Sequence, residues 1–145
     1  MWQRLRSGCR QWRDYRGASA VEFALILPVF MLIMVGTLSY GLYFGAAHSV
    51  QQLAAEAARA TVSGLTPVER ALLAQDSVNT SLPNYSMIQP ERIAVTVGAH
   101  ASNADLFDVA VTYDASNMPI WIFEGLLPLP PKVIQRAAVV RRGGY

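Results

Sequence analysis

The sequence predicts an α+β protein, with a long N-terminal membrane helix followed by a small domain that holds a short helix and an antiparallel sheet. A long uncharged apolar run predicts the first helix, a capping motif predicts the second, and alternating apolar residues predict the strands. The composition agrees, because 52% hydrophobic and 15% charged residues in a chain of 145 are too apolar for an ordinary soluble domain.

The apolar run is expected to cross a membrane. No Asp, Glu, Lys or Arg occurs between Glu22 and Glu56, and residues 23–47 are almost all apolar. As a helix rising 1.5 Å per residue, 23–47 would span about 37 Å, enough to cross a hydrocarbon core of about 30 Å with some tilt. A buried core helix is the alternative, but the rest of the chain is too short to surround one.

The charges that flank the run predict its orientation. The segment before it is basic, with Asp14 as its one acidic residue against Arg4, Arg6, Arg10, Arg13 and Arg16. Because basic residues favour the cytoplasmic side, we expect a single-pass protein with a cytoplasmic N-terminus and a C-terminal domain outside the cytoplasmic membrane. The chain beyond residue 17 is acidic on balance, so we expect no nucleic-acid partner.

Two other interpretations stay open. The small residues Gly45, Ala46 and Ala47 could end a signal peptide, which would release a small secreted domain cut near Ala47. The length of the run disfavours this, since the apolar region of a signal peptide is typically about 7 to 15 residues long. The second alternative is an unprocessed, signal-anchored binding protein.

The start of the run carries a recognisable motif. The phrase RGASAVEFALILPVFMLIMVG, followed by AAEAARA, resembles the TadE-like family of tight-adherence (Flp) pilus assembly proteins, which are minor pseudopilins. The resemblance implies that a prepilin peptidase cuts after Gly17 and removes residues 1–17, so that Ala18 becomes the first residue and Glu22 the fifth. It also implies a pilin-like role in the bacterial inner membrane, with a periplasmic domain and with other pilin-like and pilus-assembly proteins as partners. Incorporation into the pilus itself stays open.

Glu22 and Phe23 are the candidate subunit-recognition residues. A charge placed among apolar residues is costly unless it is paired, which makes Glu22 a functional candidate. After cleavage, the Glu22 carboxylate of one subunit could neutralise the new amino terminus of a neighbour. The alternative is a helix-start residue whose charge complements the helix dipole.

A stripe of small residues predicts helix packing. Thr37, Gly41, Gly45 and Ser49 recur every four residues, so they share one face of a helix and would let a partner backbone approach closely. The alternative is that such residues are simply common in membrane helices. Tyr40, Tyr43 and Phe44 are expected near the outer interface, as in an aromatic belt.

The remaining chain predicts the outer domain. The helix should continue to about residue 60, and Thr66-Pro67-Val68-Glu69 predicts a second helix ending near Ser81. Residues 92–99, 107–113 and 133–141 are expected to form strands, and the apolar, proline-rich 118–131 a covering loop. This divides the chain into a leader (1–17), a span with its extension (18–60) and a periplasmic domain (61–145).

No pattern in the sequence supports catalysis. His48 and His100 are isolated, and neither a nucleophile motif nor a phosphate-binding glycine loop occurs. We therefore expect a protein that is not an enzyme and that takes no cofactor, metal or small-molecule substrate.

Overall fold

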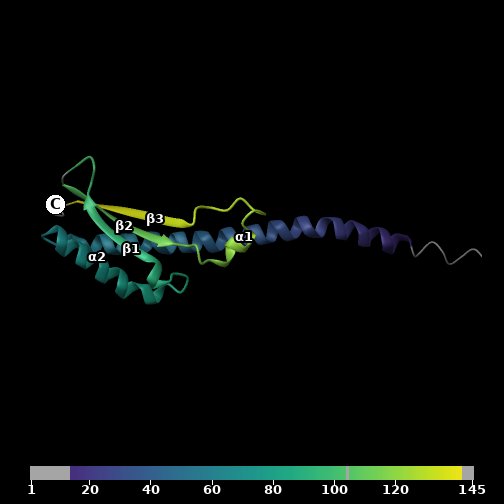
Figure 1. Ribbon diagram of the computed structural model, residues 1–145, viewed down its shortest axis with the longest axis horizontal. Helices are drawn as coiled ribbons and strands as arrows, with labels where there is room; N and C mark the ends of the chain where they lie inside the picture. Colours follow the sequence, from purple (N-terminus) through teal and green to yellow (C-terminus); the bar gives the residue numbers. More distant parts are fainter. Residues whose placement is uncertain (1–13, 104, 142–145) are drawn as a thin grey trace, which may run out of the picture. The chain divides into compact units, whose positions relative to one another are not determined.

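The computed structural model describes residues 14–103 and 105–141, and it confirms the predicted α+β class (Figure 1). Within these residues, two α-helices and three strands follow one another, with short 3₁₀ helices in the connections: α1 (Asp14–Ala60), α2 (Pro67–Ser81), β1 (Ile93–Ala99), β2 (Leu106–Asp114) and β3 (Val133–Arg141). Contacts within the chain divide it into two compact units, one ending at Leu38 and the other beginning at Ser39.

The part of α1 in the second unit is the platform on which the domain is built. Its sequence is rich in alanine, the strongest helix former. The side chains that it buries recur every three or four residues and so form a single stripe: Ser39, Tyr43, Ala46, Ala47, Val50, Leu53, Ala54, Ala57 and Ala58. Because alanine carries only a methyl group, the elements that cover this stripe can approach the helix closely.

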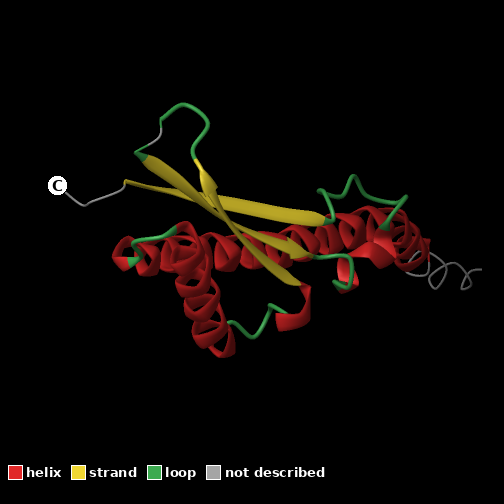
Figure 2. Cartoon of the chain, turned by 60° about the vertical axis from the view of Figure 1, so that its left-hand side comes forward, coloured by secondary structure: helices red, strands yellow, loops and turns green. Residues whose placement is uncertain are grey.

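The three strands form an antiparallel meander in the order β1-β2-β3, which confirms the pairing of the first two strands that the alternating residues predicted. In the register, Val109 on the central strand lies between Val97 of β1 and Ala138 of β3. Every second residue of β2 is buried, from Phe107 to Tyr113, so one face of the sheet belongs to the core (Figure 2). That core also contains the α1 stripe and Ala74 and Val78 of α2.

The start of α2 confirms the predicted capping motif. The Thr66 hydroxyl accepts a hydrogen bond from the Glu69 backbone N–H at 3.1 Å, and Pro67 occupies the first helical position. The Glu69 carboxylate accepts in return from the N–H of Leu65 at 2.8 Å, one residue earlier than in the usual capping box. These bonds satisfy backbone donors that would otherwise lack partners at the helix start.

Arg70 ties the start of α2 to the sheet. It is buried, and its guanidinium carbon lies 4.9 Å from the ring centroid of Phe107 on β2. Gly64 leaves room for this arginine, because a Cβ at that position would lie 2.7 Å from Cγ of Arg70. A basic side chain thus joins the core through its stem and an aromatic face.

The division into leader, membrane span and periplasmic domain stays a prediction. The structure shows, however, that the last two parts share a core. Residues 61–145 do not have a core of their own, because the buried stripe of α1 lies in the same cluster as the strand residues Val109 and Val111. The extension of the predicted span is therefore part of the folded domain.

Candidate functional site

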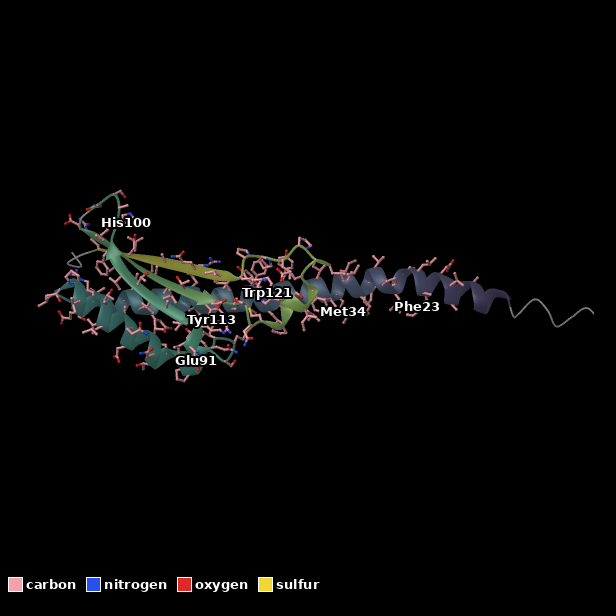
Figure 3. All side chains as sticks on the ribbon, in the orientation of Figure 1. Phe23, Met34, Glu91, His100, Tyr113 and Trp121 are labelled. Atoms are coloured by element: carbon pink, nitrogen blue, oxygen red, sulfur yellow. The ribbon has the colours of Figure 1, made fainter. Side chains whose placement is uncertain are left out.

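The predicted processing and recognition residues lie near the start of α1, in the first unit. Gly17, Ala18, Glu22 and Phe23 are all helical and exposed, and Figure 3 shows the Phe23 side chain projecting from the helix. A Cβ at Gly17 would meet no atom within 4 Å. Ala18 and Glu22 are one helical turn apart and therefore share a face. No observation tests their roles, which stay predictions.

The rest of α1 up to Leu38 has the surface of a membrane helix. The most apolar 18-residue stretch of this helix has no buried residue, and the helix is long and apolar enough to cross a membrane. The large apolar side chains here are exposed on every side, including Leu25, Phe30 and Ile33. A helix that is hydrophobic all round is solvated by lipid or by other helices and not by water.

The residues of the predicted small-residue stripe do not all have the same surroundings. Gly45 already has a neighbour in the chain, because a Cβ there would lie 3.3 Å from Sδ and Cε of Met87, whereas a Cβ at Gly41 would meet nothing within 4 Å. The hydroxyls of Thr37 and Ser49 donate to helix carbonyls one turn earlier, those of Ile33 and Gly45, at 2.9 and 3.0 Å. Thr37 and Gly41 are thus the exposed positions of the stripe, and partner packing along it stays a prediction.

The aromatic residues predicted near the interface have different neighbours. Tyr43 is buried in the core of the domain, so its ring does not face lipid as a belt residue would. Phe44 is exposed, and its ring centroid lies 6.1 Å from that of Tyr40. The hydroxyl of Tyr40 donates a hydrogen bond to the backbone carbonyl of Pro128, in the segment that links β2 to β3.

The segment that links β2 to β3 has both buried and exposed apolar residues, and the sequence predicted only that it is an apolar loop. Ile120 is buried in the core and the Trp121 indole N–H donates to the Ala115 carbonyl at 2.6 Å, so these two side chains anchor the segment. Ile122 and Leu126 are among its exposed apolar residues. The prolines and apolar residues of the segment predicted a loop, but no local pattern indicates which of them turn outward.

Three close contacts between a basic or histidine side chain and a carboxylate lie on the surface of the described part of the domain. Arg92 contacts Asp114 at 3.0 Å, His100 contacts Asp108 at 2.7 Å, and Lys132 contacts Glu124 at 2.8 Å. Hydrogen bonds from the Ser116 hydroxyl and backbone N–H hold the pKa of Asp114 below its ordinary value, helped by the charge of Arg92.

Two further polar groups have structural partners. His48, on α1, lies 3.1 Å from the amide nitrogen of Gln52. Burial raises the pKa of Tyr85, as does its hydrogen bond to the Glu56 carboxylate, which links the chain after α2 back to α1. Over residues 14–103 and 105–141, no group of three or more His, Cys, Asp or Glu is arranged to hold a metal ion.

These features define the class of the protein: an α+β domain built on a long apolar helix that indicates membrane anchoring. The family comparison is more specific, since residues 17–59 match the model of the TadE-like protein family. This match confirms the resemblance over the segment that carries the motif, and it implies a pseudopilin-like role associated with the Tad pilus and its assembly proteins. No curated protein and no solved structure matches the chain.

Proposed function

We propose that this protein is a non-enzymatic minor pseudopilin that supports assembly of a tight-adherence pilus after cleavage behind Gly17. The observation that carries the proposal is the RGASAVEFAL motif at the start of an exposed apolar helix, which from Gly17 onward lies in the segment that matches the TadE-like model. The basic segment before the motif supports a cytoplasmic N-terminus and a periplasmic domain. The partners would be a prepilin peptidase and other pilin-like subunits in the inner membrane.

The local conformation of Gly17 bears on this cleavage. The residue lies in the first turns of α1, so its peptide bond to Ala18 lies within a helix. Glycine costs about 1 kcal/mol relative to alanine inside a helix, and helix ends fray readily. A glycine at this point therefore lowers the cost of unwinding the residues before Ala18 while the rest of the span stays helical.

The cleavage is tested by mass spectrometry of the chain from cells that contain a prepilin peptidase. We expect the mature protein to begin at Ala18 and Gly17→Val to accumulate as the full-length chain. Gly41→Val is the matched control, because a Cβ at either glycine would meet no atom within 4 Å and only Gly17 borders the cleaved bond. A wild-type chain that still begins at Met1, or that begins near His48, would overturn this part of the proposal.

Glu22 is proposed to pair with a new amino terminus. Because Ala18 and Glu22 lie one turn apart on one helix, the carboxylate of a subunit is also within reach of its own amino group. Pairing between subunits and pairing within one subunit therefore compete, and the choice between them would change as helices come together. Pairing of either kind neutralises charge that would be costly in lipid.

The role of Glu22 is tested by crosslinking between mature subunits and by counting surface pili, with each variant made at a matched level. Glu22→Ala should leave processing and insertion intact but reduce both readouts, since the charge is lost while the helix gains a better former. Glu22→Gln keeps the shape, so an equal defect would assign the effect to charge. Wild-type crosslinking and piliation from Glu22→Ala would reduce this residue to a helix start.

Neither alternative function is favoured by a specific observation. A cut near Ala47 would divide α1 inside the stripe that is buried in the domain core, and it would remove Tyr43 and Ala46 from that core. An unprocessed anchor would leave the glycine and glutamate of the motif without a role. The mass of the mature chain distinguishes both from the proposed pseudopilin.

A further inference from the structure

The turn formed by residues 122–127 presents apolar side chains that its own domain does not cover. Ile122 is 80% exposed and Leu126 is 69% exposed. The turn has a defined shape, because the backbone N–H groups of Leu126 and Leu127 both donate to the Phe123 carbonyl, at 3.0 and 3.1 Å. Gly125 provides the positive φ of 93° that this turn needs and that other residues rarely adopt. The two exposed side chains are therefore held outward by an ordered backbone.

The 122–127 turn is held beside α1 at the position of Tyr40. Ile120 is buried in the core just before the turn, and just after it the Pro128 carbonyl accepts the hydrogen bond from Tyr40. Phe44, next to Tyr40 on the helix surface, is exposed. The hydrogen bond at Pro128 therefore holds the end of the turn at Tyr40, one helical turn before the exposed Phe44.

The number of residues between Glu22 and Tyr40 indicates how deep Tyr40 and Phe44 would lie in a bilayer. From Glu22, the last charged residue before the span, to Leu42 a helix rises about 30 Å, which is the thickness of a hydrocarbon core. With Glu22 at one boundary, Tyr40 and Phe44 therefore reach the other. Aromatic rings are enriched at this depth, where an apolar body and a polar tip are both accommodated.

A solvated ion pair accompanies the turn, because Glu124 lies within it and Lys132 follows it along the chain. Lys132 Nζ lies 2.8 Å from a carboxylate oxygen of Glu124 and 5.3 Å from the ring centroid of Trp121. The side chains of Lys132 and Glu124 are 46% and 59% exposed, so this ion pair stays solvated. A tryptophan flanked by a lysine, beside exposed aliphatic residues, is typical of a surface that rests in the headgroup region of a membrane.

We propose that the 122–127 turn inserts Ile122 and Leu126 into the interfacial layer of the membrane on the side of the folded domain, beside the end of the span. Lipid is the occupant that these observations favour, because the turn is tied to α1 at Tyr40, near the exposed Phe44, and because an aromatic ring and a solvated ion pair accompany its exposed aliphatic side chains. Attachment at α1 and at the turn would fix the depth of the domain at the bilayer. The proposal rests on membrane anchoring and is independent of cleavage and of pilus assembly.

The test places a fluorescent probe at single positions in the full chain. Cys9, the single cysteine of the sequence, is replaced by serine, and Ile122→Cys or Leu126→Cys is labelled with an environment-sensitive nitrobenzoxadiazole group. Matched controls are Leu65→Cys and Leu72→Cys, because Leu65 is 85% and Leu72 is 67% exposed but both lie at or near α2. The proteins are reconstituted in phosphatidylcholine–phosphatidylglycerol vesicles with or without lipids that carry a nitroxide near the headgroup.

We expect blue-shifted emission at positions 122 and 126, with quenching by the nitroxide lipids several-fold greater than at 65 and 72. Equal, water-like emission at all four positions would overturn the proposal. A blue shift that grows with protein density in the vesicle would assign the turn to a second copy of the chain. A blue shift that requires another pilus subunit would assign it to that subunit, and either result would overturn lipid as the occupant.

Discussion

The two parts of α1 meet their surroundings in opposite ways. Up to Leu38 the helix exposes large side chains on every side, whereas from Ser39 it buries one stripe that is mostly alanine. In the first part only overall apolarity matters, because lipid adapts to any apolar shape. In the second part individual shapes matter, because the covering residues are fixed by the sheet. The sequence of α1 is therefore constrained by apolarity in its first part and by side-chain size in its second part.

The largest difference between the two parts of α1 is expected when a leucine in each part is replaced by aspartate. Leu53→Asp buries an unpaired carboxylate in the domain core and should cost at least about 4 kcal/mol of the free energy of unfolding. Leu32→Asp, in the exposed part, should leave the domain folded but make insertion less favourable by about 3 kcal/mol. Protease resistance in detergent micelles measures the first effect and alkaline extraction of membranes the second. Equal protease resistance in the two variants would contradict the contrast.

Added volume should separate the two parts by a smaller amount. Ala57 is fully buried against the domain, so Ala57→Leu should overpack the core and cost about 1 to 3 kcal/mol. Ala24→Leu adds the same atoms to an exposed position and should leave urea unfolding of the domain unchanged. A wild-type unfolding midpoint for Ala57→Leu would mean that the sheet does not fix the shape of the stripe.

The cap of α2 tests a local contribution to the packed part. Thr66→Ala removes the acceptor for the Glu69 backbone N–H and should cost about 1 kcal/mol. Ser63→Ala is the control, because the Ser63 hydroxyl only donates to a helix carbonyl at 3.3 Å on the surface. Chemical denaturation of the full chain in micelles compares the two variants. An effect of Ser63→Ala as large as that of Thr66→Ala would show that the cap is not specific.

The smallest expected effect depends on pH. The pKa of Asp114 is lower in the folded protein than its ordinary value, so its ionised form stabilises the fold above the unfolded pKa of about 3.9. That contribution is lost as the pH falls through the lower, folded value. Asp114→Asn should therefore be slightly less stable than wild type at pH 7, with a difference that shrinks in acid. Asp76→Asn, at an exposed position of α2, is the control, and a pH-independent difference for Asp114→Asn would refute this account.

Local signals in the sequence predicted the elements well. The Thr66–Glu69 motif predicted the start of α2, and alternation in residues 107–113 predicted the central strand, because both patterns depend on neighbours within a few residues. The family match likewise lies in the segment that holds the motif. The processing and recognition roles of Gly17 and Glu22 stay predictions, since they concern a peptidase and other subunits.

Contacts between distant segments were harder to predict. The alanines at 46, 47, 54, 57 and 58 carry the period of a buried stripe, yet alanine favours any helix, buried or exposed, so the pattern alone does not indicate a sheet beside it. The same limit applies to Met87, which lies beside Gly45, and to Tyr40, which bonds the Pro128 carbonyl. Each contact joins residues that only the complete fold brings together.

The alanine stripe also has a consequence for the nascent chain. Synthesis begins at the N-terminus, so Ala46 and Val50 are made well before Ile134, which completes the same core on β3. The strands can then pair quickly, since each bonds to its neighbour in sequence, but until the last one is made the stripe has no cover. Methyl groups expose much less apolar area than leucine side chains would, which limits adhesion to other unfinished chains during this interval.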